Sequence, residues 1–296
     1  MRALLYRLTP RLAPYILHLR PASMGIVFVQ VSVGFLLANG LRFGSGQLWR
    51  WLLGYVVWAV FLHGGTLALN SAFDKDEGDI GYLENPPPPP RYLLHFGLGM
   101  MLAGVALASL LGWRYLLAVS ACFVMSILYS VPPMRLKARA GFDLLINMIG
   151  YGGLTTYAGW AAMARPLEPP MINVFIANAF FMGGFYPLTQ IYQMEEDASR
   201  GDYTLALALG RGRALLAGML GVGLGFVFLA IEVLQRWRDM RSLGLLLGLA
   251  AWGWVLLPWY RRRAQADVAY DQRRFYHALA AGAVTDLAII LAMLPR

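Results

Sequence analysis

Residues 70–79 read Asn70-Ser71-Ala72-Phe73-Asp74-Lys75-Asp76-Glu77-Gly78-Asp79, and they end an apolar run that is long enough to cross a lipid bilayer. Charged side chains at the end of such a run are costly, so they usually mark function. Carboxylates this close together repel one another unless a cation lies among them. This stretch therefore predicts a cation site at the surface of a membrane.

A second acidic cluster ends another apolar run, where residues 190–197 read Gln190-Ile191-Tyr192-Gln193-Met194-Glu195-Glu196-Asp197. Gln190, Gln193 and Asp197 are separated by three and then four residues, which predicts that they share one face of a single helix. We expect this face to bind a cation more weakly than a face of three aspartates would, because glutamine is a neutral ligand.

The composition is that of an integral membrane protein. The chain has 296 residues, 58% of them hydrophobic, and a mean hydropathy of +0.54. Only 14% are charged, against about 25% in soluble domains. The net charge of +9 is explained by basic loops that meet anionic lipid. No basic recognition helix or aromatic platform is present in the sequence, so we expect no nucleic-acid partner.

Hydropathy predicts an all-α, polytopic membrane protein in which nine transmembrane helices form a single bundle around a central apolar cavity. Small residues within the apolar runs favour close packing of these helices. The predicted spans are 22–40, 51–72, 92–112, 115–131, 143–164, 171–191, 213–234, 241–259 and 276–294.

The N-terminal segment 1–21 differs from the rest of the chain. Four arginines and three prolines interrupt it, and no apolar core leads to a cleavage site, so it is not typical of a signal peptide. We expect residues 1–21 to form an amphipathic arm on the inner membrane face, and residues 22–296 to form the nine-helix domain.

The distribution of lysine and arginine predicts the orientation. With the N-terminus inside, seventeen of these residues lie on the inner side and eight on the outer side. Both acidic clusters then lie on the cytoplasmic face of what we expect to be a bacterial inner membrane.

A basic loop lies between the two acidic clusters in the sequence. Residues 129–139 read Tyr129-Ser130-Val131-Pro132-Pro133-Met134-Arg135-Leu136-Lys137-Ala138-Arg139, and the prolines end the preceding span. Arginine forks onto phosphate oxygens and lysine supplies a point charge. Opposite two acidic clusters, this loop predicts a clamp for a diphosphate.

These elements together predict a magnesium-dependent reaction of a lipid diphosphate. Asn70 and Asp74 lie four residues apart and share a helix face, and oxygen ligands of this kind suit Mg²⁺ bound together with substrate phosphates. Ionisation of an allylic diphosphate gives a carbocation and pyrophosphate, whose charge Mg²⁺ and arginine stabilise. A dry aromatic cavity would protect the cation from water.

At these residues the chain resembles the UbiA superfamily of intramembrane prenyltransferases. Asn70, Asp74 and Asp76 match the first aspartate-rich motif of that family, residues 129–137 match its Tyr-Ser-x-Pro-Pro-x-Arg-Leu-Lys segment, and Asp197 matches the end of its second motif. The resemblance covers nearly the whole chain. It implies transfer of an isoprenyl group from a polyprenyl diphosphate to a hydrophobic acceptor within the membrane lipid.

The resulting hypothesis assigns a role to each candidate residue. The metal ligands are Asn70, Asp74, Asp76, Asp79 and Asp197. The catalytic residues are Asp74, Arg135 and Lys137. The substrate-binding residues are Asn70, Tyr129, Arg135, Lys137, Arg139, Gln190 and Gln193.

The chain departs from the family pattern at several positions. Gly78 stands where the last aspartate of the first motif is expected, and Gln190 and Gln193 stand where the second motif often has aspartate. These departures leave two alternatives open: a UbiA-type terpene cyclase that needs no separate acceptor, and a transport or lipid-binding protein without catalysis.

Overall fold

The computed structural model describes residues 2–74, 80–81, 83–235 and 240–295. Over these residues the chain is helical, with isolated bridges but no sheet. The helices before residue 131 are α1 (Arg2–Leu8), α2 (Ala13–His18), α3 (Met24–Asn39), α4 (Ser45–Tyr55), η2 (Val56–Gly64), α5 (Gly65–Asp74), α6 (Leu93–Ala108) and α7 (Trp113–Ser130). Those after it are η4 (Leu136–Ala138), α8 (Phe142–Asn147), η5 (Met148–Leu154), α9 (Thr155–Ala162), α10 (Pro169–Ile191), α11 (Met194–Ser199), α12 (Leu205–Gln235), α13 (Gly244–Arg261) and α14 (Val268–Met293).

Eight helical runs within the described residues are long and apolar enough to cross a membrane. They correspond to eight of the nine predicted spans. The ninth, predicted at 143–164, is the continuous run of α8, η5 and α9, whose Asp143, Asn147, threonines and glycines make it more polar. The expected all-α membrane bundle is therefore confirmed.

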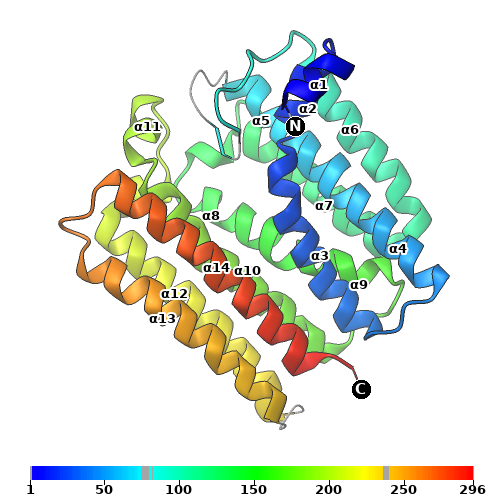
Figure 1. Cartoon of the computed structure of the whole chain (residues 1–296), viewed down its shortest axis with the longest axis vertical. Helices are drawn as coiled ribbons and strands as arrows, with labels where there is room; N and C mark the ends of the chain where they lie inside the picture. The colour runs from blue at the N-terminus through cyan, green and yellow to red at the C-terminus, as the bar shows by residue number, and fades with distance from the viewer. Residues whose placement is uncertain (1, 75–79, 82, 236–239, 296) are drawn as a thin grey trace.

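The helices form two groups that lie side by side, as Figure 1 shows. In one group α10, α12, α13 and α14 enclose a core that includes Leu188, Leu229 and Trp259. In the other, α3 to α7 and α9 enclose a core that includes Leu69, Met101 and Tyr115. The sequence therefore folds as one bundle with two packed halves, and α8 and η5 lie between them (Figure 1).

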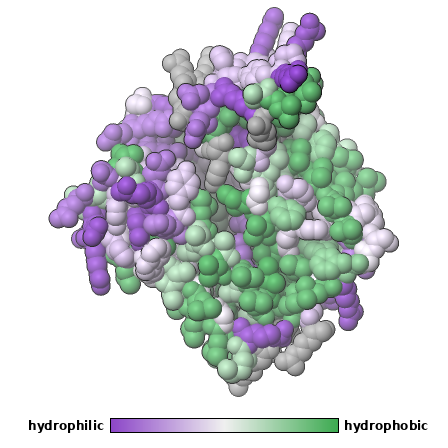
Figure 2. Space-filling model, viewed as in Figure 1, coloured by the Kyte–Doolittle hydropathy of each residue, from purple (hydrophilic) through white to green (hydrophobic). Residues whose placement is uncertain are grey.

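The surface of the bundle is apolar around its middle. Figure 2 shows a broad hydrophobic area there, with hydrophilic residues gathered at the end that carries α11 and the N-terminus. Leucines 110, 220 and 247 are among the large apolar side chains that remain exposed, as lipid contact requires. The C-terminus lies at the opposite end from α11 (Figure 1), which agrees with an odd number of crossings.

The N-terminal segment packs on the loop that follows the first acidic cluster. Arg2 Nη1 donates to the carbonyl of Glu84 at 3.1 Å, and His18 Nε2 lies 3.0 Å from the carbonyl oxygen of Pro87. Leu4, Leu8 and Leu12 are exposed, as in a segment that rests on lipid. The boundary between arm and domain at residue 21 stays a prediction.

Close approach of helix backbones requires glycine on α12. A Cβ added at Gly221 would overlap the backbone of Gly184 on α10, whereas a Cβ at Gly223 would meet nothing within 4 Å. The two positions lie on the same helix, one facing α10 and the other exposed. Backbone contact between α10 and α12 thus depends on the small residue at position 221.

We expect Gly221→Ala to lower the free energy of unfolding by about 1–3 kcal/mol, because the added methyl group forces the helices apart. Thermal unfolding of the purified protein in detergent measures the effect. Gly223→Ala is the matched control and should leave stability unchanged or slightly raised, since alanine favours helix. Equal loss of stability in both variants would contradict the packing described.

Candidate active site

A polar cavity of about 220 Å³ opens at the end of the bundle that carries α11. Asn70 and Asp74, from the last turns of α5, line one side of it. Gln193 and Asp197, from the segment after α10, line another. Asn70 and Asp74 of the first acidic cluster therefore share one opening with Gln193 and Asp197 of the second.

The basic loop lies between these two sides and neutralises both. The Lys137 ammonium pairs with the Asp74 carboxylate. Arg135 lies 3.4 Å from Asp74 through Nη2 and 2.5 Å from Asp202 through Nη1. Arg200 continues the series, 3.9 Å from Asp202 and 2.9 Å from Asp197. Positive and negative groups thus alternate across the cavity from Lys137 to Asp197.

Burial makes these pairs sensitive to any incoming ion. Desolvation lowers the pKa of Lys137, and the neighbouring Asp74 carboxylate opposes that shift. Desolvation raises the pKa of Asp197, and the hydrogen bond and charge of Arg200 oppose it. Each group is held charged by its partner rather than by water. A bound anion could pair with the lysine and arginine side chains while its counter-cation pairs with the aspartates. The total charge of the cavity would then change little.

Asp143 builds the framework that holds the cavity together. It is fully buried at the start of α8, and its Oδ1 accepts from the amides of Gly141 and Leu144, both at 2.8 Å. Its Oδ2 accepts from Gln190 Nε2 at 2.7 Å and from the amide of Leu205 at 3.0 Å. One carboxylate therefore joins the start of α8 to the end of α10 and the start of α12.

Gln190 is part of the same framework. Besides its bond to Asp143, its Oε1 accepts from the amide of Ala206 at 3.1 Å, so both of its amide atoms are engaged. Gln190 lines the polar cavity and also fixes its wall, and its role in substrate binding stays a prediction. The glutamine that departs from the family pattern thus has a structural reason.

One prediction about the second cluster is wrong. Gln190, Gln193 and Asp197 do not lie on one helix face, because α10 ends at Ile191 and α11 begins at Met194. The chain turns between the two helices, with Gln193 preceding α11. The turn still directs both Gln193 and Asp197 to the cavity. Spacing alone could not show where the helix ends.

Other predicted residues fall into three groups. Tyr129 lines the cavity, and its hydroxyl lies 2.9 Å from that of Tyr186. Arg139 is exposed, outside the residues that line the cavity, and donates to the carbonyl of Pro133 at 3.1 Å. Asp76 and Asp79 lie outside the described residues.

Arg20 and Asp202 are among the residues of the site that were not singled out from the sequence. Arg20, in the linker between α2 and α3, lines the polar cavity and donates to Ser71 Oγ at 3.2 Å. Asp202 returns to the cavity because a turn brings its amide to the carbonyl of Asp197 at 3.0 Å. The sequence signal for Asp202 is its position five residues after Asp197. Arg20 shows no signal beyond its position next to the first span.

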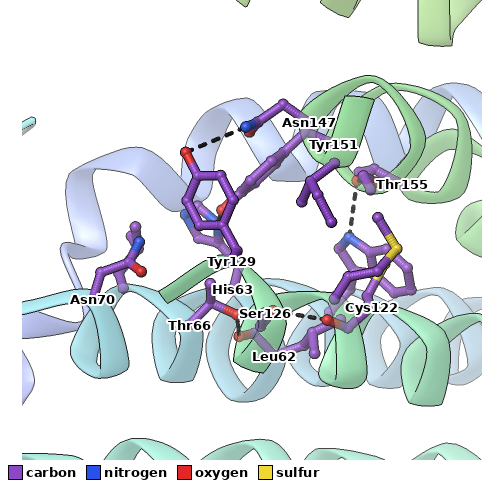
Figure 3. Close-up of a pocket in the computed structure, with 15 residues that line it drawn as sticks. Leu62, His63, Thr66, Asn70, Cys122, Ser126, Tyr129, Asn147, Tyr151 and Thr155 are labelled. Atoms are coloured by element: carbon purple, nitrogen blue, oxygen red, sulfur yellow. Dashed lines mark hydrogen bonds between the residues drawn. The ribbon is translucent and has the colours of Figure 1, made fainter. Parts of the chain in front are cut away.

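An apolar cavity of about 200 Å³ lies beside the polar one and shares Asn70 and Tyr129 with it. Figure 3 shows Asn70 at one end of this apolar cavity and Cys122 and Thr155 at the other. No Asp, Glu, Lys or Arg is found among the described residues that line it. A ligand with a charged head and an apolar tail would therefore find matching surroundings for both ends.

The described oxygen ligands fit Mg²⁺ in their chemistry. Among the described residues no three acidic, histidine or cysteine side chains come close enough to form a complete metal site. Asn70 and Asp74 nevertheless offer an amide and a carboxylate side by side on the cavity wall. One or two carboxylates are what Mg²⁺ takes from a protein when phosphate oxygens and water supply its remaining ligands.

Comparison with known proteins gives consistent matches. The family model described as "UbiA prenyltransferase family" matches residues 27–280. A lycopene elongase/hydratase of Halobacterium salinarum is 27% identical over 216 residues, which cover 65% of this chain and 72% of that protein.

Solved structures show the same fold. A UbiA homolog from Archaeoglobus fulgidus, bound to DMAPP and Mg²⁺, has a TM-score of 0.70 at 18% identity, covering 93% of this chain and 98% of that one. A structure that concerns digeranylgeranylglyceryl phosphate synthase has a TM-score of 0.68 at 15% identity, covering 97% and 99%. At such identities the likeness shows the fold alone.

We expect Asp143→Ala to lower the free energy of unfolding by about 3 kcal/mol or more, because donors that it satisfies in the interior lose their acceptor. Chemical or thermal denaturation in detergent measures this loss. Asp267→Ala removes an exposed cap of α14, whose carboxylate accepts from the Tyr270 amide at 2.6 Å. Asp267→Ala serves as the control, and we expect it to lower the free energy of unfolding by about 1 kcal/mol. A smaller loss for Asp143→Ala than for the control would argue against the framework.

Proposed function

The chain belongs to the UbiA prenyltransferase family, and from that premise we propose that it transfers an isoprenyl group from a polyprenyl diphosphate to a neutral, hydrophobic acceptor inside the membrane. Members of the family are prenyltransferases, and this chain is an integral membrane enzyme of that kind. The observation that carries the proposal is that two neighbouring cavities, one lined by paired charges and one apolar, share Asn70 and Tyr129 in their walls.

The diphosphate would lie among the cations of the polar cavity. Lys137, Arg135 and Arg20 line it or border it from two sides. Lys137 pairs with Asp74, and a phosphate group in the cavity would give Lys137 a second anionic partner. Arginine forks onto two phosphate oxygens, which fixes the orientation of the head group. The isoprenyl tail would then extend past Tyr129 into the apolar cavity.

The residues present are suited to hold Mg²⁺ as well. Asn70 and Asp74 would be its ligands, with Asp197 or Asp202 facing them across the cavity. When bound, Mg²⁺ would neutralise the charge of the departing pyrophosphate. We retain Asp76 and Asp79 as proposed further ligands.

The chain's own residues would promote ionisation in three ways. Arg135 and Lys137 would stabilise the charge that develops on the leaving pyrophosphate. The apolar lining would keep water from the carbocation. The ring faces of Trp58, Tyr129 and Tyr151, all on the wall of the apolar cavity, would stabilise the positive charge.

The lining of the apolar cavity favours an uncharged acceptor. Its polar groups are paired with one another: Trp58 Nε1 with Thr155 at 3.1 Å, and Thr66 with Ser126 at 2.7 Å. An acceptor with a carboxylate or phosphate would find no cation there. We therefore propose an alkene acceptor such as a polyene hydrocarbon. The name of the relative from Halobacterium salinarum, a lycopene elongase/hydratase, supports this choice.

The direct test is incubation of the purified protein in vesicles with dimethylallyl diphosphate, Mg²⁺ and lycopene, with pyrophosphate release and prenylated product measured together. We expect both, and we expect chelation of Mg²⁺ by EDTA to abolish them. A companion reaction contains geranylgeranyl diphosphate and Mg²⁺ without acceptor. If its sole product is a cyclic hydrocarbon, the enzyme is a cyclase and the proposal of transfer to an acceptor is wrong. Binding of either diphosphate without pyrophosphate release would contradict catalysis.

The enzyme lies in a membrane, and we propose that the polar cavity opens on its cytoplasmic side. The bias of lysine and arginine toward that side supports the proposal, because positive residues are retained on the inner face. A substrate diphosphate would then enter from the cytoplasm.

We expect Arg135→Ala to lower kcat/KM for the diphosphate, because it removes a charge-assisted bond. The loss should correspond to a rise of about 1–3 kcal/mol in the activation free energy. Arg263→Ala is the control, because Arg263 is exposed between α13 and α14 and lies over the ring of Tyr260. Steady-state pyrophosphate release measures both variants. An unchanged kcat/KM for Arg135→Ala would exclude Arg135 from the diphosphate site.

A further inference from the structure

A histidine and a tyrosine meet on the wall of the apolar cavity. His63 Nδ1 lies 2.9 Å from the hydroxyl of Tyr151, and the rings pack edge to face with centroids 5.5 Å apart. Both residues line the cavity, and His63 supplies the one imidazole among the described residues that do so. In Figure 3 His63 lies between Asn70, at the polar end, and Thr155 at the far end.

The hydrogen-bond partners favour one tautomer of His63. Ser23 Oγ lies 2.8 Å from the carbonyl oxygen of Arg20, to which it donates, and we therefore assign it as the acceptor at 2.7 Å from His63 Nε2. Nε2 therefore carries the proton of the neutral imidazole, and Nδ1 accepts from the hydroxyl of Tyr151. The arrangement is that of a phenol bonded to a base.

The backbone is irregular at both His63 and Tyr151. His63 lies in η2 and Tyr151 in η5, and both are π-helical segments inside longer helices. π-Helical turns are rare and occur frequently at functional sites. Here two π-helical segments border one cavity, and each contributes one residue of the His63–Tyr151 hydrogen bond. This backbone geometry is a second observation that favours a functional role for the pair.

Tyr129 provides an internal contrast. Its hydroxyl also faces the junction of the two cavities, but its partners are the hydroxyl of Tyr186 at 2.9 Å and the side-chain amide of Asn147 at 3.3 Å. Neither partner is a base. Of these two tyrosines, Tyr151 is the one whose hydroxyl is hydrogen-bonded to a base, so it can pass on its own proton when it receives another.

We propose that Tyr151 is the catalytic residue that removes the proton which ends the reaction, and that His63 is the positioning residue that holds Tyr151 and stores the proton. The inference rests on the proposed transfer to an alkene. Attack of an acceptor double bond on the prenyl carbon forms the new carbon–carbon bond and leaves a tertiary carbocation on the acceptor.

The step that follows is balanced within the site. The electron pair of a C–H bond next to the cationic carbon becomes a new double bond, and its proton goes to the oxygen of Tyr151. The hydroxyl proton of Tyr151 passes to Nδ1 of His63. One positive charge moves from carbon to the imidazole, so no charge is created in the apolar interior. Water that enters after the products leave takes the proton away.

The test compares alkene with alcohol among the products, because a cation that keeps its proton is captured by water. Wild-type enzyme in vesicles receives dimethylallyl diphosphate, Mg²⁺ and lycopene, and in a second reaction geranylgeranyl diphosphate and Mg²⁺ alone. For Tyr151→Phe we expect the ratio of alkene to alcohol to fall by about tenfold or more, as for loss of a positioned base. Pyrophosphate release is measured in the same samples and reports ionisation, the step that precedes proton removal.

A second variant separates proton transfer from a structural role. In His63→Gln the amide can still accept from Tyr151 and donate to Ser23, but it cannot take a proton. We expect the same fall in the product ratio as for Tyr151→Phe, whereas a structural role predicts the wild-type ratio. Tyr157→Phe is the control, since Tyr157 on α9 lies outside the lining of both cavities.

Each outcome is decisive. Unchanged product ratios in Tyr151→Phe and His63→Gln overturn the proton relay and leave the proposed function intact. Wild-type enzyme that releases pyrophosphate but yields only alcohols also overturns the relay alone. Absence of pyrophosphate release from wild-type enzyme in both reactions overturns the proposed function and the relay with it.

Discussion

The pairing of Asp74 with Lys137 and Arg135 is the interaction on which the active site depends. Asp74 ends a helix that is buried over most of its length, and a carboxylate there is stable only with a cation beside it. The same requirement applies to Arg135, which needs Asp202, and to Arg200, which needs Asp197. A partly buried set of alternating charges is thereby kept together until a ligand of matching charge replaces some of the partners. Next to it lies a cavity that offers no such charge among its described residues. This contrast is what selects a molecule with a diphosphate head and a hydrocarbon tail.

The fold places these groups through a few polar contacts inside an otherwise apolar bundle. Asp143 accepts four hydrogen bonds and so fixes the segments that carry Gln190 and residues 141–144 relative to the start of α12. At Gly210, with φ of 73°, α12 kinks before it enters the bundle. The residues before the kink can therefore bond to Asp143 and Gln190, while the rest of the helix crosses the membrane. The two π-helical segments turn His63 and Tyr151 toward one cavity. Helix packing supplies the walls, and these irregular positions decide which side chains face the interior.

The sequence predicted the bundle and most of the site. Hydropathy located the eight runs that are apolar enough to cross a membrane, because they are long and separated by charge, and the ninth prediction falls on the more polar run of α8, η5 and α9. Asn70, Asp74, Lys137 and Asp197 were predicted from their type and position, and they do line one cavity. What spacing could not show was a break in the backbone: the turn at Tyr192 separates Gln190 from Gln193. It also could not show contacts between distant segments, such as those of Arg20 with Ser71 or Asp202 with Arg135. Arg139, predicted to bind substrate from its place in the basic loop, lies outside the residues that line the cavity and bonds to the carbonyl of Pro133 in its own loop. Its role and those of Asp76 and Asp79 stay predictions.

The central claim is that one molecule occupies both cavities, with its diphosphate among the paired charges and its tail beyond Tyr129. The most direct measurement is an experimental structure of the protein with Mg²⁺ and a prenyl thiolodiphosphate, which resists ionisation. The account predicts phosphate density between Asp74 and Asp197, in contact with Arg135 and Lys137, and a hydrocarbon chain that passes Tyr129 toward Thr155. A diphosphate bound elsewhere, or a chain that leaves the apolar cavity empty, would contradict it.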